Sequence, residues 1–257
     1  IEVEVRAANE TGASVTNKEL CLEIKEHPNG QTVYRKNIRL ESLKEGENLQ
    51  TYQIKVPNAH LWSVDSPRLY DLRISLNDDA VTERFGFRWF EIKDIKGDRQ
   101  FFLNGKRIVL RTAISWGFWP YNGITPSDEL AKRQITIAKE LGLNMLNFNR
   151  NIGQTNILDY ADELGLLYFE EPGGNQYTIK NLNDNDKQSN FYFTYRNEKL
   201  ARMVKRDRNH PSLIIYNLHN ERGAYPQTQD YDQMRMAHAL DPTRILTYNS
   251  SNGENPA

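Results

Sequence analysis

The sequence has little of what marks several common classes of protein. Cys21 is its single cysteine, so no intrachain disulfide can form, and its place between two leucines suggests an inert strand residue. One thiol fits a cytosolic protein and equally an exported one without disulfides. No apolar run approaches the roughly 20 residues that a membrane-spanning helix needs. The 33 basic side chains balance 34 acidic ones, which favours neither nucleic acid nor a membrane as a partner.

Motifs for cofactors and metals are missing as well. The sequence has no phosphate-cradling glycine pattern and no serine-centred nucleophile elbow. Its five histidines are scattered without the spacing of a metal site. We therefore expect no cofactor and no bound metal. Ile1 lies inside a predicted strand and is not Met, so we also expect the chain to be a segment of a longer protein.

The first part of the chain has the pattern of an antiparallel β-domain. Six segments rich in Val, Ile, Tyr and Thr alternate apolar with polar residues, and turn signals such as Pro28-Asn29-Gly30 separate them. The segments span residues 1–8, 19–26, 32–40, 48–56, 69–76 and 81–90. They predict a β-sandwich over residues 1–92. It is immunoglobulin-like at most, because the Cys…Trp…Cys spacing of antibody domains is absent.

From about residue 93 strands alternate with amphipathic helices. A hairpin comes first, and its Asn104-Gly105 pair suits a type I′ turn. Thr125 as N-cap and Pro126 as the first helical residue then open a helix whose apolar residues are Leu130, Ile137, Ala138 and Leu141. Strands are predicted at residues 109–115, 144–148, 166–170, 213–218 and 245–248, and later helices around 157–164, 196–206 and 231–240.

The βαβα order predicts a parallel sheet with crossover helices. A doubly wound sheet could end after five strands, but the missing phosphate loop argues against it. A (β/α)8 barrel needs eight strands and about 250 residues. Residues 93–257 are therefore predicted to be the N-terminal part of a TIM barrel, with about five of its strands.

Polar side chains gather where these strands end. In either α/β architecture, reactive groups lie at the C-terminal ends of the strands. Carboxylates, amides, an arginine and indoles together are typical of glycoside hydrolysis. The residues at these ends are Trp116, Trp119, Asn147, Asn149, Arg150, Glu170, Glu171, Asn217, His219, Asn220 and Glu221.

The most informative stretch runs from Arg206 to Glu221. A charged helix end passes through Pro211 into a buried strand, which brings Asn220 and Glu221 to its C-terminal tip. A glutamate there is partly desolvated, which raises its pKa and lets it remain protonated as a general acid. The neighbouring asparagine can hydrogen-bond a sugar 2-hydroxyl. The pattern therefore predicts a catalytic carboxyl at Glu221.

This stretch resembles the acid/base signature of glycoside hydrolase family 2, which includes β-galactosidases, β-glucuronidases and β-mannosidases. The resemblance runs from about residue 50 to 250, and the family's N-terminal jelly roll has no counterpart in these residues. Other stretches agree in order and spacing. They are residues 61–70 and 86–88 near the end of the sandwich, 102–106 at the hairpin, and 162–167 and 240–244 in the barrel.

The resemblance implies a retaining glycosidase that acts on terminal β-linked sugars by double displacement. Glu221 is then the acid/base and Asn220 the 2-hydroxyl partner. The nucleophile comes from the seventh barrel strand, beyond Ala257, so this segment alone should be inactive. A carbohydrate is the expected partner, and the resemblance allows an oligomer of the full-length protein. The alternative is a catalytically inactive carbohydrate-binding or scaffold protein.

Several positions depart from the family's pattern. Asn147 stands where the family usually has Arg, and Arg150 stands where it usually has His. Arg150 is interpreted as a sugar or carboxylate contact, with an ordinary salt bridge as the alternative. His219 replaces the usual Gly, and Tyr216 the usual Trp. His219 either tunes Glu221 or packs.

Two further features of the strand ends have alternative interpretations. Trp116 and Trp119 form a sugar platform or plug the mouth of the barrel. Glu171, followed by Pro172-Gly173-Gly174, is expected to line the site rather than to react.

Overall fold

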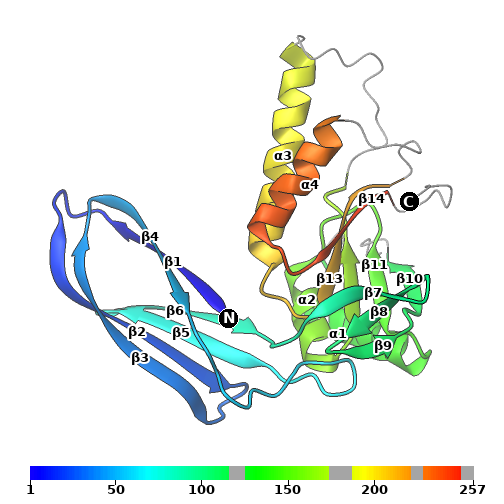
Figure 1. The fold of residues 1–257 in the computed structure, drawn as a ribbon, viewed down its shortest axis with the longest axis horizontal. Coiled ribbons are helices and arrows are strands. Elements are labelled where there is room, and N and C mark those ends of the chain that lie inside the picture. The colour runs from blue at the N-terminus through cyan, green and yellow to red at the C-terminus, as the bar shows by residue number, and fades with distance from the viewer. Residues whose placement is uncertain (116–124, 174–186, 221–227, 250–257) are drawn as a thin grey trace. The chain divides into compact units, whose positions relative to one another are not determined.

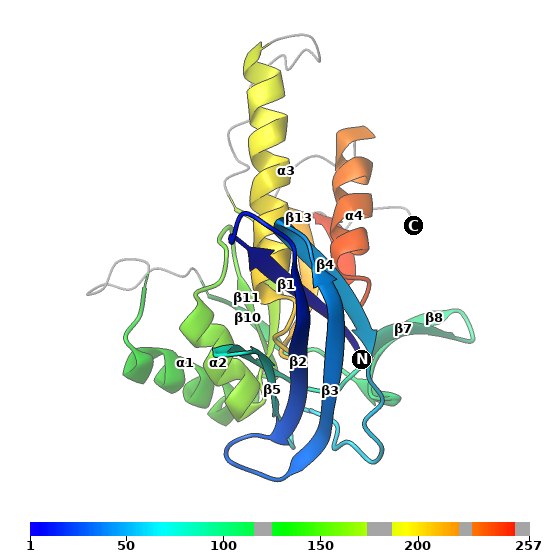
Figure 2. The same ribbon diagram turned by 90° about the vertical axis from the view of Figure 1, so that its left-hand side faces the viewer.

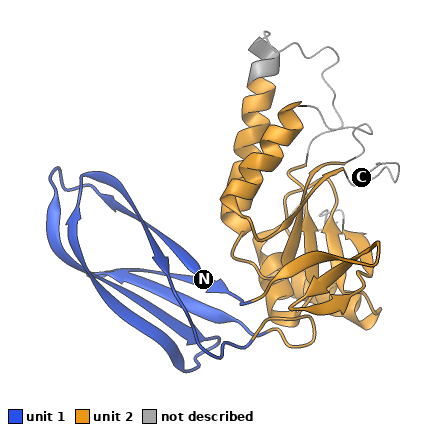
Figure 3. Cartoon of the chain, in the orientation of Figure 1, with its two compact units in different colours: residues 1–60, 68–87 blue, residues 61–67, 88–257 orange. Residues whose placement is uncertain are grey.

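The structure is a computed structural model that describes residues 1–115, 125–173, 187–220 and 228–249, with backbone alone at 187–190. The chain divides into two compact units (Figure 3). Unit 1 contains residues 1–60 and 68–87, and unit 2 contains residues 61–67 and 88–257. No helix in the described ranges is long and apolar enough to cross a membrane.

Unit 1 is a sandwich of two antiparallel sheets (Figure 1). Strands β1 and β4 pair in one sheet, and the other has the order β3-β2-β5-β6. The arrangement confirms the predicted immunoglobulin-like sandwich. The strands are β1 (Glu2–Asn9), β2 (Val15–Glu26), β3 (Thr32–Leu43), β4 (Gly46–Gln53), β5 (Tyr70–Leu76) and β6 (Asp79–Phe85).

The core of unit 1 follows from alternation along its strands. On β2, Leu20, Leu22 and Ile24 are at most 2% exposed and lie in one apolar cluster. Because successive side chains of a strand point to opposite faces, the residues between them face away from this cluster. Cys21 is one of these, opposite Asn37 and Ser75 on the neighbouring strands. It is a strand residue, as predicted.

The last predicted strand of the sandwich is too long. Residues 81–90 were expected to form one strand, but β6 ends at Phe85, and β7 (Phe90–Ile95) belongs to unit 2. Arg88 lies between them and donates to backbone carbonyls of Pro211 and Leu213 in unit 2. The alternation of apolar residues continues through this stretch, so pattern alone could not locate the break.

Unit 2 begins with an antiparallel three-stranded sheet of β7, β8 (Asp98–Leu103) and β9 (Lys106–Ile108). Asn104 and Gly105 have φ values of 53° and 76°. Positive φ at both central residues is what a type I′ turn requires, so this prediction is confirmed. The Asn104 side chain also donates to the backbone oxygen of Trp62 at 2.8 Å.

The main sheet of unit 2 is parallel, and its five strands are neighbours in chain order, β10-β11-β12-β13-β14 (Figures 1 and 2). A doubly wound sheet reverses its strand order at a switch point, whereas a barrel adds each strand on the same side. The order confirms the predicted partial barrel. The strands are β10 (Thr112–Ser115), β11 (Met145–Phe148), β12 (Leu167–Glu170), β13 (Leu213–His219) and β14 (Ile245–Asn249).

Four helices cover one face of this sheet in the described residues. Helix α1 (Asp128–Glu140) packs beside α2 (Thr155–Leu164), and α3 (Lys187–Asp207) packs beside α4 (Thr228–Leu240). Side chains of the sheet such as Phe148 and Tyr168 are fully buried in the same cluster as Ile135 of α1. Figures 1 and 2 show that α3 extends past the ends of the strands.

Helix α1 differs from its prediction in both start and face. Ser127, not Thr125, is the N-cap, and its Oγ accepts from the Leu130 amide. Of the predicted apolar residues Ala138 is buried, but Ile137 is 41% and Leu141 74% exposed, and the other buried residues are Ala131 and Ile135. Two alanines allow α1 to approach the sheet closely. Tertiary packing therefore selected the face with smaller side chains.

Helix α3 also starts earlier than predicted, at Lys187 rather than near Arg196. Its first turns are polar and aromatic and lack the apolar spacing from which a helix is recognised. The extra turns are the part of α3 that borders the C-terminal ends of the strands.

Candidate active site

The C-terminal ends of β10, β11 and β12 are joined by hydrogen bonds from the loops that follow them. The Asn149 amide donates to the backbone oxygen of Ser115 at 3.1 Å. The Arg150 amide donates to Oε2 of Glu171 at 3.2 Å. The structure therefore brings Arg150 and Glu171 together, although they lie 21 residues apart in the chain.

The backbone between these loops is tightly packed. Arg150 has a φ of 62°, which is unusual for a residue with a side chain. Gly173 has a φ of 70°, and a Cβ added to it would collide with the carbonyl oxygen of Arg150. Only glycine fits here without displacement of the neighbouring loop. This contact fixes the direction in which the chain leaves β12.

The two glutamates at the end of β12 have separate surroundings. Glu170 is fully buried, accepts from the Gly153 amide at 2.7 Å, and lies 3.6 Å from Nη2 of Arg206. Burial, with the negative charge of Asp207, raises the pKa of Glu170 well above its usual value. Glu171 is 1% exposed and accepts from the Arg150 amide in the same loop.

At the tip of β13 the structure places His219 and Asn220, which are 0% and 8% exposed. The side chain of Asn217 donates to the backbone oxygen of His219 and accepts from Thr247 Oγ1 at 2.7 Å. These bonds tie the end of β13 to β14. The next residue, Glu221, lies outside the described residues, as do Trp116 and Trp119.

His219 belongs to a buried ionic network between β13 and the two helices behind it. Its Nε2 lies 2.8 Å from Oδ1 of Asp230 on α4 and 2.7 Å from Nη2 of Arg196 on α3. The same arginine nitrogen lies 2.7 Å from Gln233 Oε1 and 3.3 Å from Asp230 Oδ1. The ring of Tyr248 packs edge-on against His219 at 5.4 Å. We name the four residues Arg196, His219, Asp230 and Gln233 the β13 network.

Sequence reasoning missed three members of this network. Arg196, Asp230 and Gln233 are 7%, 0% and 4% exposed. Charged and amide side chains on a helix usually face solvent, so their presence on α3 and α4 predicted an exposed face. Asp230, Gln233 and Ala237 do share helical spacing on α4. The spacing alone does not show that this face of α4 is buried. The position of His219 opposite these residues shows it.

The first half of the 206–221 stretch has a structural role. Asp162 accepts from the Ser212 amide at 2.9 Å and from His210 Nδ1 at 2.6 Å. Burial lowers the pKa of His210, but the hydrogen bond to Asp162 and its negative charge outweigh burial and raise the pKa. Arg206 binds Asp207 and also the backbone oxygen of Gly153, at 2.6 Å. These contacts fix the start of β13 and hence the place of its tip.

The model described as "Glycosyl hydrolases family 2, TIM barrel domain" matches residues 92–256, and that described as "Glycosyl hydrolases family 2" matches residues 1–88. The chain belongs to glycosyl hydrolase family 2. The resemblance noted in the sequence is thereby confirmed.

Individual family 2 proteins show the same relationship. A β-galactosidase of Thermoanaerobacterium thermosulfurigenes is 30% identical over 84% of this chain and 29% of its own length. The structure of a Parabacteroides merdae β-glucuronidase is 28% identical, with a TM-score of 0.70 over 92% of this chain and 30% of its own. A Bacteroides uniformis β-glucuronidase shares the fold, with a TM-score of 0.80 at 24% identity over 96% of this chain and 31% of its own. The chain thus spans about a third or less of these relatives.

The described part of the chain brings no three His, Cys, Asp or Glu side chains together in a way that could hold a metal ion. The described strand ends present carboxyl, amide, guanidinium and imidazole groups, which can exchange protons and make hydrogen bonds.

Proposed function

We propose that the protein of which this chain is part is a retaining β-glycosidase that hydrolyses terminal β-linked sugars. The observation that carries the proposal is the buried Asn220 at the C-terminal tip of β13, directly before Glu221, in a family 2 barrel. Reactive groups of such barrels lie at this edge of the sheet. Family membership supports the reaction class.

In the proposed reaction Glu221 acts as general acid and then as general base. It gives its proton to the glycosidic oxygen of the leaving group while a second carboxylate attacks the anomeric carbon. The resulting glycosyl-enzyme is hydrolysed by water, which Glu221 deprotonates. The two carboxyl groups of a retaining enzyme lie about 5–5.5 Å apart. We assign the second carboxylate to a later barrel strand, outside this chain.

Four other residues are proposed to contact substrate. Asn220 donates to the sugar 2-hydroxyl, a bond that strengthens in the transition state. Glu171 and Arg150 line the neighbouring strand ends, which the short contact between the Arg150 amide and Glu171 supports. Trp116 is proposed to supply an aromatic face. His219 acts indirectly, through its place in the β13 network.

We further propose two domains, a sandwich over residues 1–92 and the start of the barrel over 93–257. The described units support a division in this region, since unit 1 ends at Phe87. The inserted segment 61–67 belongs to unit 2, where the Trp62 indole donates to the Asp162 backbone oxygen at 2.8 Å.

The test is hydrolysis of a panel of aryl β-glycosides by the full-length protein and its Glu221→Gln variant. General acid catalysis contributes about 10²–10⁴-fold, so we expect a loss of that size on substrates with poor leaving groups. The leaving group of a dinitrophenyl glycoside departs without a proton, so the rate of glycosyl-enzyme formation from such substrates should change much less. Azide, which needs no general base, should restore turnover of such substrates.

Glu140→Gln removes an exposed carboxylate at the end of α1 and is the matched control. It should retain full activity on every substrate. If Glu221→Gln hydrolyses poor leaving groups as fast as the unchanged protein, the acid role is wrong. If the unchanged full-length protein binds sugars and hydrolyses none of the panel, the inactive binding protein is the better description.

A further inference from the structure

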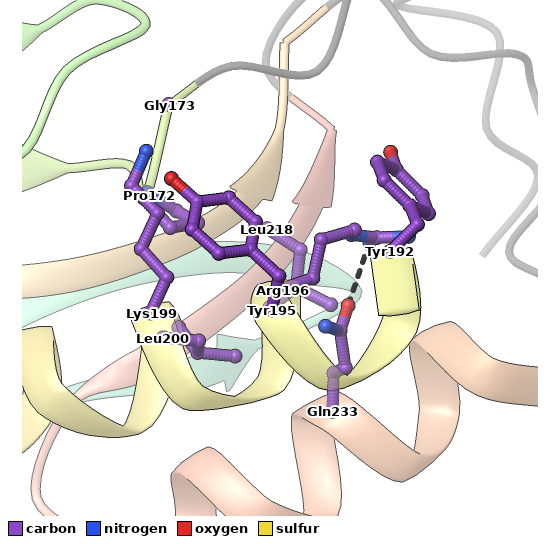
Figure 4. Close-up of a pocket in the computed structure, with 9 residues that line it drawn as sticks. All are labelled: Pro172, Gly173, Tyr192, Tyr195, Arg196, Lys199, Leu200, Leu218 and Gln233. Carbon is purple, nitrogen blue, oxygen red and sulfur yellow. Dashed lines mark hydrogen bonds between the residues drawn. The ribbon is translucent and has the colours of Figure 1, made fainter. Parts of the chain in front are cut away.

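A pocket lies beside the β13 network and takes no part in the reaction described above. It encloses about 170 Å³ between α3 and the ends of β12 and β13 (Figure 4). Pro172 and Gly173, which directly follow Glu171, form one wall, and Leu218 of β13 lies at its base. A water molecule occupies about 30 Å³ in the liquid, so the pocket has room for one small ring rather than a polymer.

Helix α3 supplies the polar groups of this pocket. Tyr192, Tyr195 and Lys199 share one side of the helix, since residues three and four apart are neighbours on its surface. Figure 4 shows the Lys199 ammonium and the Tyr195 hydroxyl on the same side of the pocket, near Pro172. The Tyr195 side chain is 54% exposed, and its ring stacks at 6.3 Å on Phe191, which is 72% exposed. The rim of the pocket is therefore aromatic and open to a ligand.

The charge of the pocket is positive. Arg196 lines it, but that guanidinium is already bound within the β13 network. Lys199 is different, because no carboxylate of the described residues lies within ion-pair distance of it and its contact is with the Tyr195 ring at 5.9 Å. Burial lowers the pKa of Lys199, so a bound anion would stabilise its charged form. None of the described residues that line the pocket is acidic.

We propose that this pocket is a subsite for an acidic sugar unit, whose carboxylate binds Lys199 and whose ring lies against Tyr195. The lining offers an ammonium group and two phenol hydroxyls as donors, and a sugar carboxylate supplies acceptors for them. Flat aromatic rings fit the C–H face of a pyranose. The choice of a sugar rests on the proposed function, since the pocket directly follows the proposed site-lining Glu171.

Binding of sodium glucuronate to the full-length protein, followed by ligand-observed NMR, tests this subsite. A charge-assisted hydrogen bond is lost in Lys199→Met, so we expect affinity to fall about tenfold or more. Lys199→Arg keeps the charge and should keep most of the affinity. Lys205→Met removes an exposed lysine from the same helix and should bind glucuronate as the unchanged protein does. Thermal melting of each variant shows that it is folded.

Two further probes separate the ligand classes. Glucose should bind more weakly than glucuronate, and inorganic sulfate should also bind more weakly because it lacks the ring. Sulfate binding as tight as glucuronate binding, with the same dependence on Lys199, would show a bare anion site and overturn the proposal. So would an absence of glucuronate binding, or binding that Lys199→Met leaves unchanged.

Failure of this subsite can be told apart from failure of the proposed function. Glucuronate binding is measured without turnover and should persist in Glu221→Gln. If that variant retains hydrolysis of poor leaving groups while Lys199-dependent binding is present, the catalytic assignment alone fails. If hydrolysis depends on Glu221 and binding does not depend on Lys199, the subsite alone fails.

Discussion

The N-terminal and C-terminal edges of the parallel sheet both contain buried charges, but these charges bind different kinds of partner. At the N-terminal edge each of them has a backbone partner, in addition to the ion pairs of Asp162 with His210 and of Arg244 with Asp241. Arg88 donates to the Leu213 carbonyl at 2.6 Å, Arg244 donates to the His210 carbonyl at 2.7 Å, and Asp162 accepts from the Ser212 amide. At the tip of β13, Arg196, Asp230 and His219 bind one another.

The two kinds of partner suit two different roles, which are to fix the path of the chain and to position side chains. Side chains that bind backbone groups replace strand and helix bonds where these elements end, and so fix the path of the chain. Side chains that bind each other can transmit a change of protonation or position to their neighbours. The first arrangement suits stability, and the second suits residues next to a reacting group. Each prediction below tests one side of this contrast.

The largest effect is expected for Asp162→Ala at the N-terminal edge. It leaves His210 and the Ser212 amide without a buried acceptor, and removal of one member of a buried pair costs about 3–5 kcal/mol. Denaturant unfolding should show this loss, while activity per folded molecule changes little. Glu163→Ala, an exposed neighbour on α2, is the control and should cost less than about 0.5 kcal/mol. If Asp162→Ala were stable but had low activity, the N-terminal edge would serve the reaction rather than stability, and this contrast would be wrong.

The same pair predicts a pH dependence. The pKa of His210 is raised in the folded chain, so its contribution is complete below the unfolded value of about 6.5 and is lost as pH rises through the folded value. The destabilisation by Asp162→Ala should therefore be larger at about pH 6 than at about pH 9. A cost that does not change with pH would mean that the charge of His210 is not involved.

Asp230→Asn tests the β13 network. The variant removes the negative charge that lies beside His219 and Arg196, but it keeps the shape of the residue 230 side chain. A displacement of about 1 Å at a reacting group can cost about 10²-fold, so we expect up to that loss in kcat on aryl glycosides with poor leaving groups. Loss on dinitrophenyl glycosides should be smaller, and the alkaline limb of the pH profile, which reports loss of the Glu221 proton, should shift.

Asp232→Asn, on the exposed side of the same helix, is the control for this variant. An equal loss of activity on all leaving groups, in step with a fall in melting temperature, would make the β13 network purely structural.

Gly173→Ala tests the packing between the loops after β11 and β12. Its Cβ would collide with the Arg150 carbonyl, and its φ of 70° disfavours a side chain. Strain of this kind costs about 1–3 kcal/mol. Gly142→Ala is the control, because Gly142 has a φ of 79° and an added Cβ would have nothing within 4 Å. Its loss of unfolding free energy measures the cost of the backbone conformation without the collision. Equal losses of unfolding free energy would show that the loop contact contributes nothing.

The smallest change is expected for Glu170→Gln. The pKa of Glu170 is raised in the folded chain, so the carboxyl stabilises fully below the unfolded value of about 4.3 and progressively less as pH rises through the folded value. The amide imitates the protonated group, so the variant should match the stability of the unchanged protein below about pH 4.3 and should lack the decline above it. A large loss of stability would show that Glu170 is needed as an anion beside Arg206.

Much of the fold was predictable because its signals are local. Alternation along Leu20, Leu22 and Ile24 fixed the buried face of β2. Asn104-Gly105 fixed a turn, because the positive φ of both residues is a property of the pair itself. The 206–221 stretch identified the family because it combines a helix end, a proline and a buried strand in one order. None of these inferences depends on a distant residue.

The predictions that were wrong concern features that depend on residues far away in the sequence. The face of α1 is set by how closely the sheet can be approached, so Ala131 is buried and Leu141 is exposed. The break between β6 and β7 is accompanied by the bonding of Arg88 to carbonyls more than 120 residues away. The β13 network could not be found, because a charge on a helix is predicted to be solvated until a buried partner is known.

The sequence by itself determined the strand alternation, the turn chemistry and the family to which the chain belongs, because each is written in neighbouring residues. Only the tertiary structure decided which charges are buried and with what they pair. Burial of a charge requires a partner from another element, and the fold alone brings Arg196, His219 and Asp230 together from two helices and a strand.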